Sequence, residues 1–459
     1  MTSHIMKTWE RVIRRHIVGH LESNGMMDPD QHGSRKNRSC LSQLLEHHEE
    51  ILKMMEEGHN VDVIYTDFAK AYEKISHAKL LNKMKLQFGI TGRLGKWIKN
   101  FLDNRKQQVL VNKTASEKSE VISGSVQGSV LGPVLFLMYI KDLSEGVTAN
   151  VKIFVDDTKI KDVIKEEKDV EQLQEELDKL FEWQEANQML FNGSKFQLLR
   201  YGPDEELKNS TLYFTDNTEQ IIERCSSLRD LGMILSEDGK FQDHIEKVST
   251  KVRQKVGWIC RSFYTRRTPI MKHLWKTLVQ CHIDYCSQLY FPGQAQGLQA
   301  LEKLFYNFTQ KIPEVREDDY WSRLKFLQMY SQERRMERYR VIYKWKILEG
   351  YVPNCGVELA TENERLGRKV KIPGLKRNGR QAIQTLREQS FQINGARLFN
   401  AMPKKIRNIV RDQEYFKASL DEFLSSVPDQ PRIGSLVPTA TDQLTGRQSN
   451  SLLAWTRDI

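Results

Sequence analysis

A hairpin pattern near the middle of the chain limits the folds open to it. Residues 151–155 and 158–163 are short runs rich in β-branched residues, with Asp156 and Asp157 at the turn between them. About 90 residues earlier, residues 60–67 alternate in the same way and end on Asp67. Because an antiparallel sheet places a strand end beside a neighbouring turn, we expect these three carboxylates to converge. The alternative for any one aspartate taken alone is a solvated turn residue.

Helical patterns surround these strands. We predict helices at residues 77–88, 93–102 and 128–143 and another beginning near Val170, and strands at residues 107–112 and 196–201. This order predicts an α/β (α+β) layer with helices on one face of an antiparallel sheet. Residues 1–57 and the region from about 245 to 425 have helical patterns, whereas residues 425–459 are rich in Ser, Thr, Pro, Gly and Gln and are expected to be disordered.

The charge balance favours a polyanionic partner, since 70 Lys and Arg residues against 60 acidic ones give a net charge of +10. The longest apolar run, Val130–Ile140, is about half the roughly 20 residues that span a bilayer, so no membrane segment is predicted. The N-terminus lacks the features of a secretory signal. Six scattered cysteines indicate free thiols in a reducing compartment, and hence an intracellular protein.

Three converging carboxylates suit hard divalent cations. Mg²⁺ takes oxygen ligands and is typically held by one or two carboxylates together with substrate phosphates. Two such ions about 3.5–4 Å apart activate an attacking hydroxyl and stabilise the leaving oxygen in an in-line phosphoryl displacement. The sequence therefore predicts a metal centre at Asp67, Asp156 and Asp157.

A set of ordered motifs surrounds these aspartates. YTDFAKAYEKI, SGSVQGSVLGPVLF, FVDD, NGSKFQLLRYG and LRDLGMIL follow the order of the palm motifs of reverse transcriptases, and QHGSRKNRSC upstream matches the fingers motif. Over about residues 5–425 the chain resembles the reverse transcriptases of non-LTR (LINE-type), jockey-like retrotransposons. The resemblance implies a right-hand polymerase fold with a ferredoxin-like palm and RNA-directed DNA synthesis, in which a primer 3′-hydroxyl attacks the α-phosphate of a dNTP.

The resemblance also implies an organisation and a set of partners. We expect partial fingers at residues 1–59, the palm at 60–245, a helical thumb-like and C-terminal region at 246–424 and a disordered tail at 425–459. The expected partners are an RNA template, a DNA primer and dNTPs, with no membrane, and no oligomeric state is predicted. The expected location is the nucleus, after synthesis in the cytoplasm.

By resemblance, the metal ligands are Asp67, Asp156, Asp157 and the backbone carbonyl of Phe68, holding two Mg²⁺ ions for which Mn²⁺ is a possible substitute. Lys195 is assigned to the pyrophosphate leaving group, and a surface lysine is the alternative. Tyr72 is assigned to exclude a ribose 2′-hydroxyl, and a core tyrosine is the alternative.

Four further residues are expected to contact substrate. Gln127 and Gly128 match the loop that contacts the incoming nucleotide and the template, and glycine lets the backbone approach a ligand closely. Arg35 and Arg38 are three residues apart, so a helix would place them on one face, where they would hold phosphates. A solvated basic face is the alternative for this pair.

Departures from the family pattern bear on activity. Ser34 replaces an aromatic residue, Val126 replaces a proline, and Glu73 replaces an aspartate. The chain also begins where the fingers are expected to be under way. A truncated, catalytically inactive remnant that only binds nucleic acid is therefore an alternative, and a maturase-like RNA-folding protein is another.

Three other groups of residues are weaker candidates. Residues 365–380 hold seven Lys or Arg and no acid, which suits phosphate contacts or a solvated linker. Cys281, His282 and Cys286 are a weak zinc candidate because no second pair stands at zinc-finger spacing. A basic and aromatic helix pattern suits either a grip on a template–primer duplex or a core: Arg334, Arg335, Arg338, Tyr339, Arg340, Tyr343, Lys344, Trp345 and Lys346.

Overall fold

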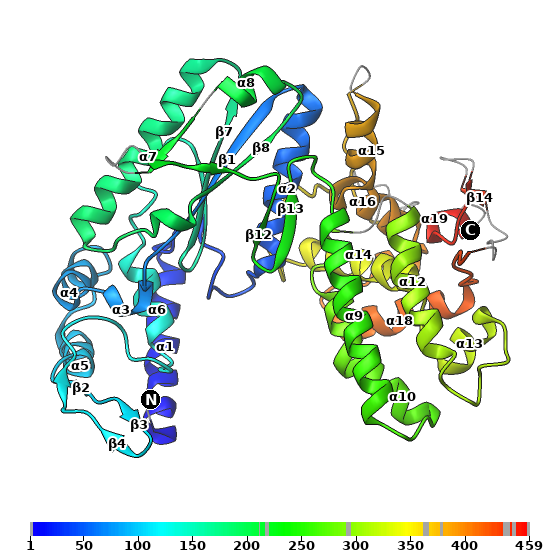
Figure 1. Cartoon of the computed structure of the whole chain (residues 1–459), viewed down its shortest axis with the longest axis horizontal. Coiled ribbons are helices and arrows are strands. Elements are labelled where there is room, and N and C mark those ends of the chain that lie inside the picture. Colours follow the sequence, from blue (N-terminus) through cyan, green and yellow to red (C-terminus); the bar gives the residue numbers. More distant parts are fainter. Residues whose placement is uncertain are drawn as a thin grey trace. The chain divides into compact units, whose positions relative to one another are not determined.

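The computed structural model describes residues 3–210, 212–215, 220–290, 295–360, 367–376, 380–434, 441–442 and 447–456 (Figure 1). The chain divides into two units. The sheet unit comprises residues 1–39 and 60–225, and the helical unit comprises residues 40–59 and 226–459. No described helix is both long and apolar enough to cross a membrane.

A five-stranded sheet with the order β11-β8-β1-β7-β6 organises the sheet unit. β1 (Asn60–Asp67) lies at its centre and pairs antiparallel with β7 (Asp157–Ile164) and β8 (Gln197–Tyr201). β6 (Asn150–Phe154) pairs with β7, and β11 (Glu223–Arg224) runs parallel to β8. Successive side chains of a strand point to opposite faces. Since Val63 and Ile64 are both fully buried, β1 is covered on both faces.

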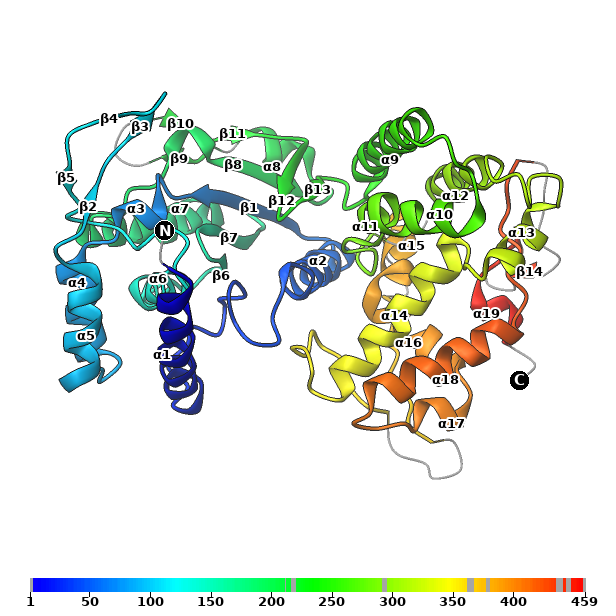
Figure 2. The same cartoon turned by 90° about the horizontal axis from the view of Figure 1, so that it is seen from below.

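The connectivity is that of a ferredoxin-like layer. α6 (Gly132–Tyr139) falls between β1 and β6 in the chain, and α7 (Glu167–Asn187) falls between β7 and β8. With the strand order β8-β1-β7-β6, this is the βαββαβ arrangement (Figure 2). Ile64 and Leu198 of the sheet share one hydrophobic core with residues of both helices. The prediction of an antiparallel α+β layer with helices on one face is confirmed.

Shorter elements complete the sheet unit: α1 (His4–Ser23), α3 (Ala71–Lys74), α4 (His77–Leu86), α5 (Gly92–Leu102), β2 (Lys106–Gln107), β3 (Leu110–Val111), β4 (Thr114–Ala115), β5 (Ser119–Glu120), η1 (Gly193–Lys195), α8 (Glu205–Ser210), β9 (Phe214–Thr215) and β10 (Gln220–Ile221). The predicted strand at residues 107–112 is wrong. Its residues divide between two exposed two-stranded ribbons, β2–β5 and β3–β4, outside the main sheet. Asn112 and Lys113 both have positive φ, which turns the chain back after two residues.

The helical unit consists mainly of helices: α2 (Cys40–Glu57), β12 (Ser227–Asp230), β13 (Met233–Ser236), α9 (Gln242–Ser262), α10 (Thr268–Leu274), η3 (Trp275–Val279), α11 (Gln280–Asp284), α12 (Ala295–Thr309), α13 (Tyr320–Leu327), α14 (Gln332–Leu348), α15 (Gln381–Gln389), α16 (Phe391–Ala401), α17 (Lys404–Arg407), α18 (Gln413–Ser426), β14 (Thr441–Asp442), β15 (Arg447–Gln448) and α19 (Leu452–Trp455). α14 lies within its core: Trp345 is fully buried and stacks on Phe416 of α18 at 4.7 Å between ring centroids.

The two units do not follow the expected boundaries at residues 59 and 245. α2, expected in the fingers, belongs to the helical unit because its acidic residues meet a buried arginine of α15. Arg387 lies 2.9 Å from the Glu49 carboxylate and 3.1 Å from that of Glu56. The β12–β13 hairpin and residues 237–245, expected in the palm, also belong to the helical unit.

Of the two alternatives for the α14 pattern, burial and ion pairing favour a core over a grip on a template–primer duplex. Arg334 and Arg340 are fully buried, and Lys344 is 1% exposed. Arg335 pairs with Asp284 at 2.7 Å, and Arg338 pairs with Asp421 at 2.5 Å. These cations hold the helical unit together.

Much of the basic segment at residues 365–380 is also bound to acids of the helical unit. Arg368 lies 2.8 Å from Glu349, and Lys371 lies 2.8 Å from Glu358. The Lys376 backbone N–H donates to Glu56 at 2.8 Å. Arg365 and Arg377 lie outside the described residues.

The predicted disorder of residues 425–459 is wrong for part of that segment. Asn450 and Leu452 are buried, and the Leu452 N–H donates to the Glu337 carboxylate at 2.9 Å. Buried contacts of this kind compensate the entropy of ordering a polar segment. Residues 435–440, 443–446 and 457–459 lie outside the described residues.

A buried carboxyl in α12 predicts a pH dependence of folding stability. Burial, with the Asp429 charge adding, raises the pKa of Glu302 to about 8. The Tyr320 hydroxyl and the Gln332 N–H donate to this carboxyl. Because the folded state favours the protonated Glu302 carboxyl, this group adds to the free energy of unfolding. Its contribution is fully present below the unfolded-state pKa of about 4.5 and is lost as the pH rises through about 8.

We therefore expect the wild-type melting temperature to fall more steeply from pH 5.5 to 8.5 than that of Glu302→Gln, as followed by circular dichroism. The exposed-residue variant Glu317→Gln is the matched control and should follow the wild type. Parallel curves for the wild type and Glu302→Gln would contradict the assignment.

Candidate active site

The structure brings three carboxylates to one end of the sheet. Asp67, the last residue of β1, lies directly opposite Asp157, the first residue of β7. Opposed residues in antiparallel strands share a face, with Cβ atoms about 5 Å apart. Asp156 precedes Asp157 in the turn from β6 to β7, and burial raises its pKa, with a further contribution from the charge of Asp67.

The turn that carries Asp156 is only two residues long. Phe154 pairs with Asp157, so Val155 and Asp156 alone connect β6 to β7. Val155 has a φ of 62°, a left-handed conformation that is unfavourable for a β-branched side chain. The surroundings must therefore hold this turn in place.

Residues 30–33 supply that support. This segment runs along the edge of β6: the His32 N–H donates to the Ile153 carbonyl at 2.9 Å, and the Ile153 N–H donates to the Asp30 carbonyl at 3.1 Å. The Gln31 Oε1 accepts the N–H groups of Gly33 at 2.6 Å and Val155 at 3.0 Å. A Cβ on Gly33 would lie 2.4 Å from Val155 Cγ2, so this position has no room for a side chain.

Lys195 is the cation of this cluster. Its Nζ donates to the Asp67 carboxylate, and this bond raises the pKa of Lys195, with smaller contributions from the charges of Asp156 and Asp157. The backbone places it there, since the Asn192 N–H donates to the Asp67 carbonyl at 2.7 Å just before η1. The structure therefore joins Lys195 to Asp67, and its role toward a leaving group stays a prediction.

Tyr72 and the loop at residues 123–128 meet beside the cluster. The Tyr72 ring stacks on Phe136 at 4.9 Å, and burial, followed by the charge of Asp156, raises the pKa of Tyr72 to about 12. The Ser125 N–H donates to the Tyr72 carbonyl at 2.8 Å. The Gln127 Nε2 donates to Glu73 at 3.3 Å, and Gly128 has a φ of 73°.

A residue far upstream anchors the end of this loop. Glu10 of α1 is fully buried, and its carboxylate accepts the N–H groups of Val130 at 2.5 Å and Leu131 at 3.1 Å. These groups lie just before α6, where an anion is favoured by the unpaired N–H groups of the helix start. Glu10 did not stand out in the sequence, and Gln31 stood out only as part of the QHGSRKNRSC motif, because each accepts backbone N–H groups more than 100 residues away.

The structure does not place Arg35 and Arg38 as predicted. Both lie in the loop before α2 and not on a helix face. Arg35 donates to the Asp28 carbonyl and lies 3.8 Å from Glu22, and Arg38 donates to the Pro29 carbonyl at 2.5 Å. These bonds fold the loop back on itself, so the pair is oriented toward backbone in this structure.

The cluster suits a divalent cation. One lysine faces three carboxylates, which leaves an excess of negative charge, and carboxylate oxygens are the ligands that hard cations prefer. Phe68, buried and stacked on Phe191 at 4.3 Å, fixes the backbone that follows Asp67. Among the described residues, no group of three or more His, Cys, Asp or Glu side chains forms a ready-made metal site.

The zinc candidate gains no support from the described residues. Cys281 is exposed whereas Cys286 is buried, and the pKa of Cys286 is raised to about 12 by burial.

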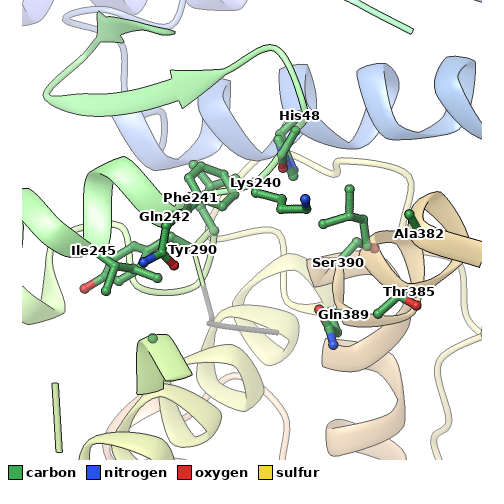
Figure 3. A pocket seen from close by; sticks show the side chains of 14 residues that line it. His48, Lys240, Phe241, Gln242, Ile245, Tyr290, Ala382, Thr385, Gln389 and Ser390 are labelled. Carbon is green, nitrogen blue, oxygen red and sulfur yellow. The ribbon is translucent and has the colours of Figure 1, made fainter. Parts of the chain in front are cut away.

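A partly open pocket of about 250 Å³ lies within the helical unit and has a different character (Figure 3). Its lining includes His48, Phe241, Tyr290 and Gln389, with no carboxylate. The His48 Nε2–H donates to the Gly239 carbonyl at 3.1 Å, and burial lowers the pKa of His48, so its imidazole is neutral. The cavity lacks the groups for metal-dependent chemistry.

The role of Gln31 in holding the Val155 turn can be tested by substitution. Gln31→Met removes the acceptor of two N–H groups while keeping the side-chain volume. An unsatisfied buried N–H costs about 1–3 kcal/mol. We therefore expect the Val155 amide to exchange with solvent at least about 10-fold faster in this variant. Hydrogen–deuterium exchange of the peptide covering residues 150–158 measures this. Gln87→Met, at an exposed side chain that donates to Asp142, is the control. Unchanged exchange in Gln31→Met would refute the role of Gln31.

Comparison with known proteins agrees with this geometry. The family model "Reverse transcriptase (RNA-dependent DNA polymerase)" matches residues 1–235. The probable RNA-directed DNA polymerase from transposon X-element of Drosophila melanogaster is 25% identical over 272 residues, covering 56% of this chain and 29% of that protein. The RNA-directed DNA polymerase from mobile element jockey of Drosophila funebris is 25% identical over 327 residues, covering 67% and 34%. The chain thus spans about a third of the length of these relatives.

Among solved structures, apo telomerase from Candida tropicalis aligns with a TM-score of 0.41 at 8% identity, over 70% of this chain and 53% of that one. The family model covers the sheet, the hairpin with its two aspartates and the Lys195 turn. Reverse transcriptases generally use divalent metal ions and have the right-hand polymerase fold predicted from the motifs. The chain belongs to the reverse transcriptase (RNA-dependent DNA polymerase) family.

Proposed function

We propose that this chain carries out RNA-templated DNA synthesis for a non-LTR, jockey-like retrotransposon, joining a dNTP to a primer 3′-hydroxyl. The observation that carries the proposal is the placement of Asp67 opposite Asp157, with Asp156 in the adjoining turn and Lys195 bound to Asp67. Family membership and the two Drosophila relatives support it.

In this proposal Asp67, Asp156 and Asp157, with the Phe68 carbonyl, hold two Mg²⁺ ions, for which Mn²⁺ can substitute. Bound ions of this kind activate the attacking hydroxyl and neutralise charge on the leaving pyrophosphate. Lys195 carries an exchangeable proton beside the same carboxylates, so it is the residue we assign to the leaving group.

Tyr72 and Gln127 form the proposed nucleotide side of the site. The Tyr72 ring is fixed by its stack on Phe136, and the contact between Gln127 and Glu73 holds the 123–128 loop beside it. A rigid ring at this position would collide with a 2′-hydroxyl. The proposed partners are an RNA template and a DNA primer, and the proposed location of the reaction is the nucleus, where chromosomal DNA supplies the primer.

The carboxylate assignment is tested by primer extension on poly(rA)–oligo(dT) with Mg²⁺. We expect Asp156→Asn to lower incorporation at least about 100-fold, because it removes a charge on which the reacting groups depend. Asp178→Asn, on the exposed side of α7, changes the net charge equally and should retain activity. If the wild-type chain binds the duplex but incorporates nothing, the chain is a nucleic-acid-binding remnant and the proposal fails.

The assignment of Tyr72 predicts a change in sugar selectivity. In Tyr72→Ala, the ratio of kcat/KM for dTTP over UTP should fall about 10-fold or more, because a steric block at one position typically discriminates 10- to 200-fold. Tyr72→Phe keeps the ring and should keep the ratio. Equal ratios in the wild type and Tyr72→Ala would mean that Tyr72 serves only to pack against Phe136.

A further inference from the structure

The pocket of the helical unit is built from four separate stretches of the chain (Figure 3). His48 comes from α2, Phe241 from the turn before α9, Tyr290 from the segment before α12 and Ser390 from the start of α16. All four stretches belong to the helical unit. At about 250 Å³, the pocket is larger than the roughly 150 Å³ cavity that holds one benzene molecule. It therefore has room for an aromatic ring with a substituent.

The wall of the pocket is more apolar than polar, and its rings are fixed in place. Phe241 packs against His48 at 4.9 Å between ring centroids, and Tyr290 packs edge-on against His244 at 4.8 Å. The Tyr290 hydroxyl already donates to the Ile283 carbonyl, so it adds only its ring to the wall. A preformed apolar wall with aromatic side chains favours the burial of a planar ring.

One hydroxyl in this wall has no partner among the described residues. Ser390 is 5% exposed, and its Oγ forms no hydrogen bond. The residue stands at the N-cap of α16, where a serine side chain ordinarily accepts an N–H of the first turn. Here the Glu49 carboxylate accepts the Gln392 N–H at 2.7 Å instead. A buried hydroxyl without a partner costs free energy, which an acceptor bound in the pocket would restore.

The pocket also offers an acceptor and has no unbalanced charge. Burial lowers the pKa of His48, so the imidazole is neutral. Because its Nε2–H donates to the Gly239 carbonyl, its Nδ1 is an acceptor. No described carboxylate lines the pocket, and Lys240 Nζ lies 3.2 Å from the Asp238 carboxylate. An anionic ligand would lose its hydration here without gaining an unpaired cation.

We propose that this pocket binds a small, neutral aromatic carboxamide. The ring of the ligand lies against Phe241 and Tyr290, its carbonyl accepts the Ser390 hydroxyl, and its N–H donates to His48 Nδ1. A carboxamide supplies an acceptor and a donor together and carries no charge. The inference is independent of the proposed polymerase chemistry, because none of the lining residues belongs to the carboxylate cluster.

Benzamide is the probe, and ligand-observed NMR titration with the full chain measures its affinity. Two compounds with the same ring separate the contributions: toluene lacks the amide, and benzoate carries a charge at neutral pH. We expect benzamide to bind at least about 5-fold more tightly than toluene, because it forms hydrogen bonds in the pocket. Benzoate should bind more weakly than benzamide, because its charge must be desolvated.

Ala382→Trp tests the location of the site. Ala382 is an exposed residue of α15 that lines the pocket, so a tryptophan there should fill the pocket without disturbing the core. We expect this variant to lose benzamide binding. Ala300→Trp, at an exposed position of α12 outside the lining, is the matched control and should bind benzamide as the wild type does. Benzamide should raise the melting temperature of the wild type and of Ala300→Trp but not that of Ala382→Trp.

Ser390→Ala tests the polar contact. It should weaken benzamide binding roughly 3- to 10-fold and leave toluene binding unchanged, because it removes one hydrogen bond and keeps the apolar wall. The Ser390 Oγ caps no helix, so the variant should fold as the wild type does.

The proposal is overturned if benzamide does not bind up to its solubility limit, or if toluene or benzoate binds as tightly as benzamide. Unchanged benzamide affinity in Ala382→Trp or in Ser390→Ala would also overturn it. Asp156→Asn separates this inference from the catalytic one, because that variant should lose primer extension while it binds benzamide like the wild type.

Discussion

The carboxylate cluster depends on the two-residue turn at Val155 and Asp156. Only a connection this short sets β7 so that Asp157 begins the strand opposite Asp67. Slipping the register by one residue would move every side chain of β7 to the other face of the sheet. A non-glycine residue in the left-handed region costs on the order of 1–2 kcal/mol. The turn persists because Gln31 accepts the Val155 N–H and because Gly33, which lacks a side chain, leaves room for the Val155 side chain.

The elements that the sequence predicted well are those whose pattern is local. β1, β6, β7 and β8 contain runs of β-branched or apolar residues, and α7 has an apolar stripe, so each was expected within a few residues of its observed bounds. The strand predicted at residues 107–112 had the same composition but no buried neighbour, and it became exposed ribbons. Composition alone does not distinguish a strand in a sheet from one in an isolated hairpin.

The parts that could not be predicted depend on distant partners. Glu10 and Gln31 are ordinary polar residues until the fold brings backbone N–H groups to them. Arg334 and Arg340 looked like a nucleic-acid surface because charged residues are seldom fully buried. Their burial became evident only with the structure, in which Arg340 donates to the Gln389 carbonyl and Arg334 to the Pro428 carbonyl. A count of basic residues therefore overstates the charge that a polyanion can reach.

Neither unit is a single stretch of sequence, because the chain passes from one to the other after residues 39, 59 and 225. A fragment cut at the edges of the motif region, from residue 60 to residue 245, would lose Glu10, Gln31 and Gly33 while keeping a β12–β13 hairpin without the helices of its own unit. A fragment that keeps the carboxylate turn supported must therefore extend upstream of residue 60 to include residues 10–33. Insertions and deletions should be tolerated better in the exposed ribbons between residues 105 and 120 than at any of the three crossings.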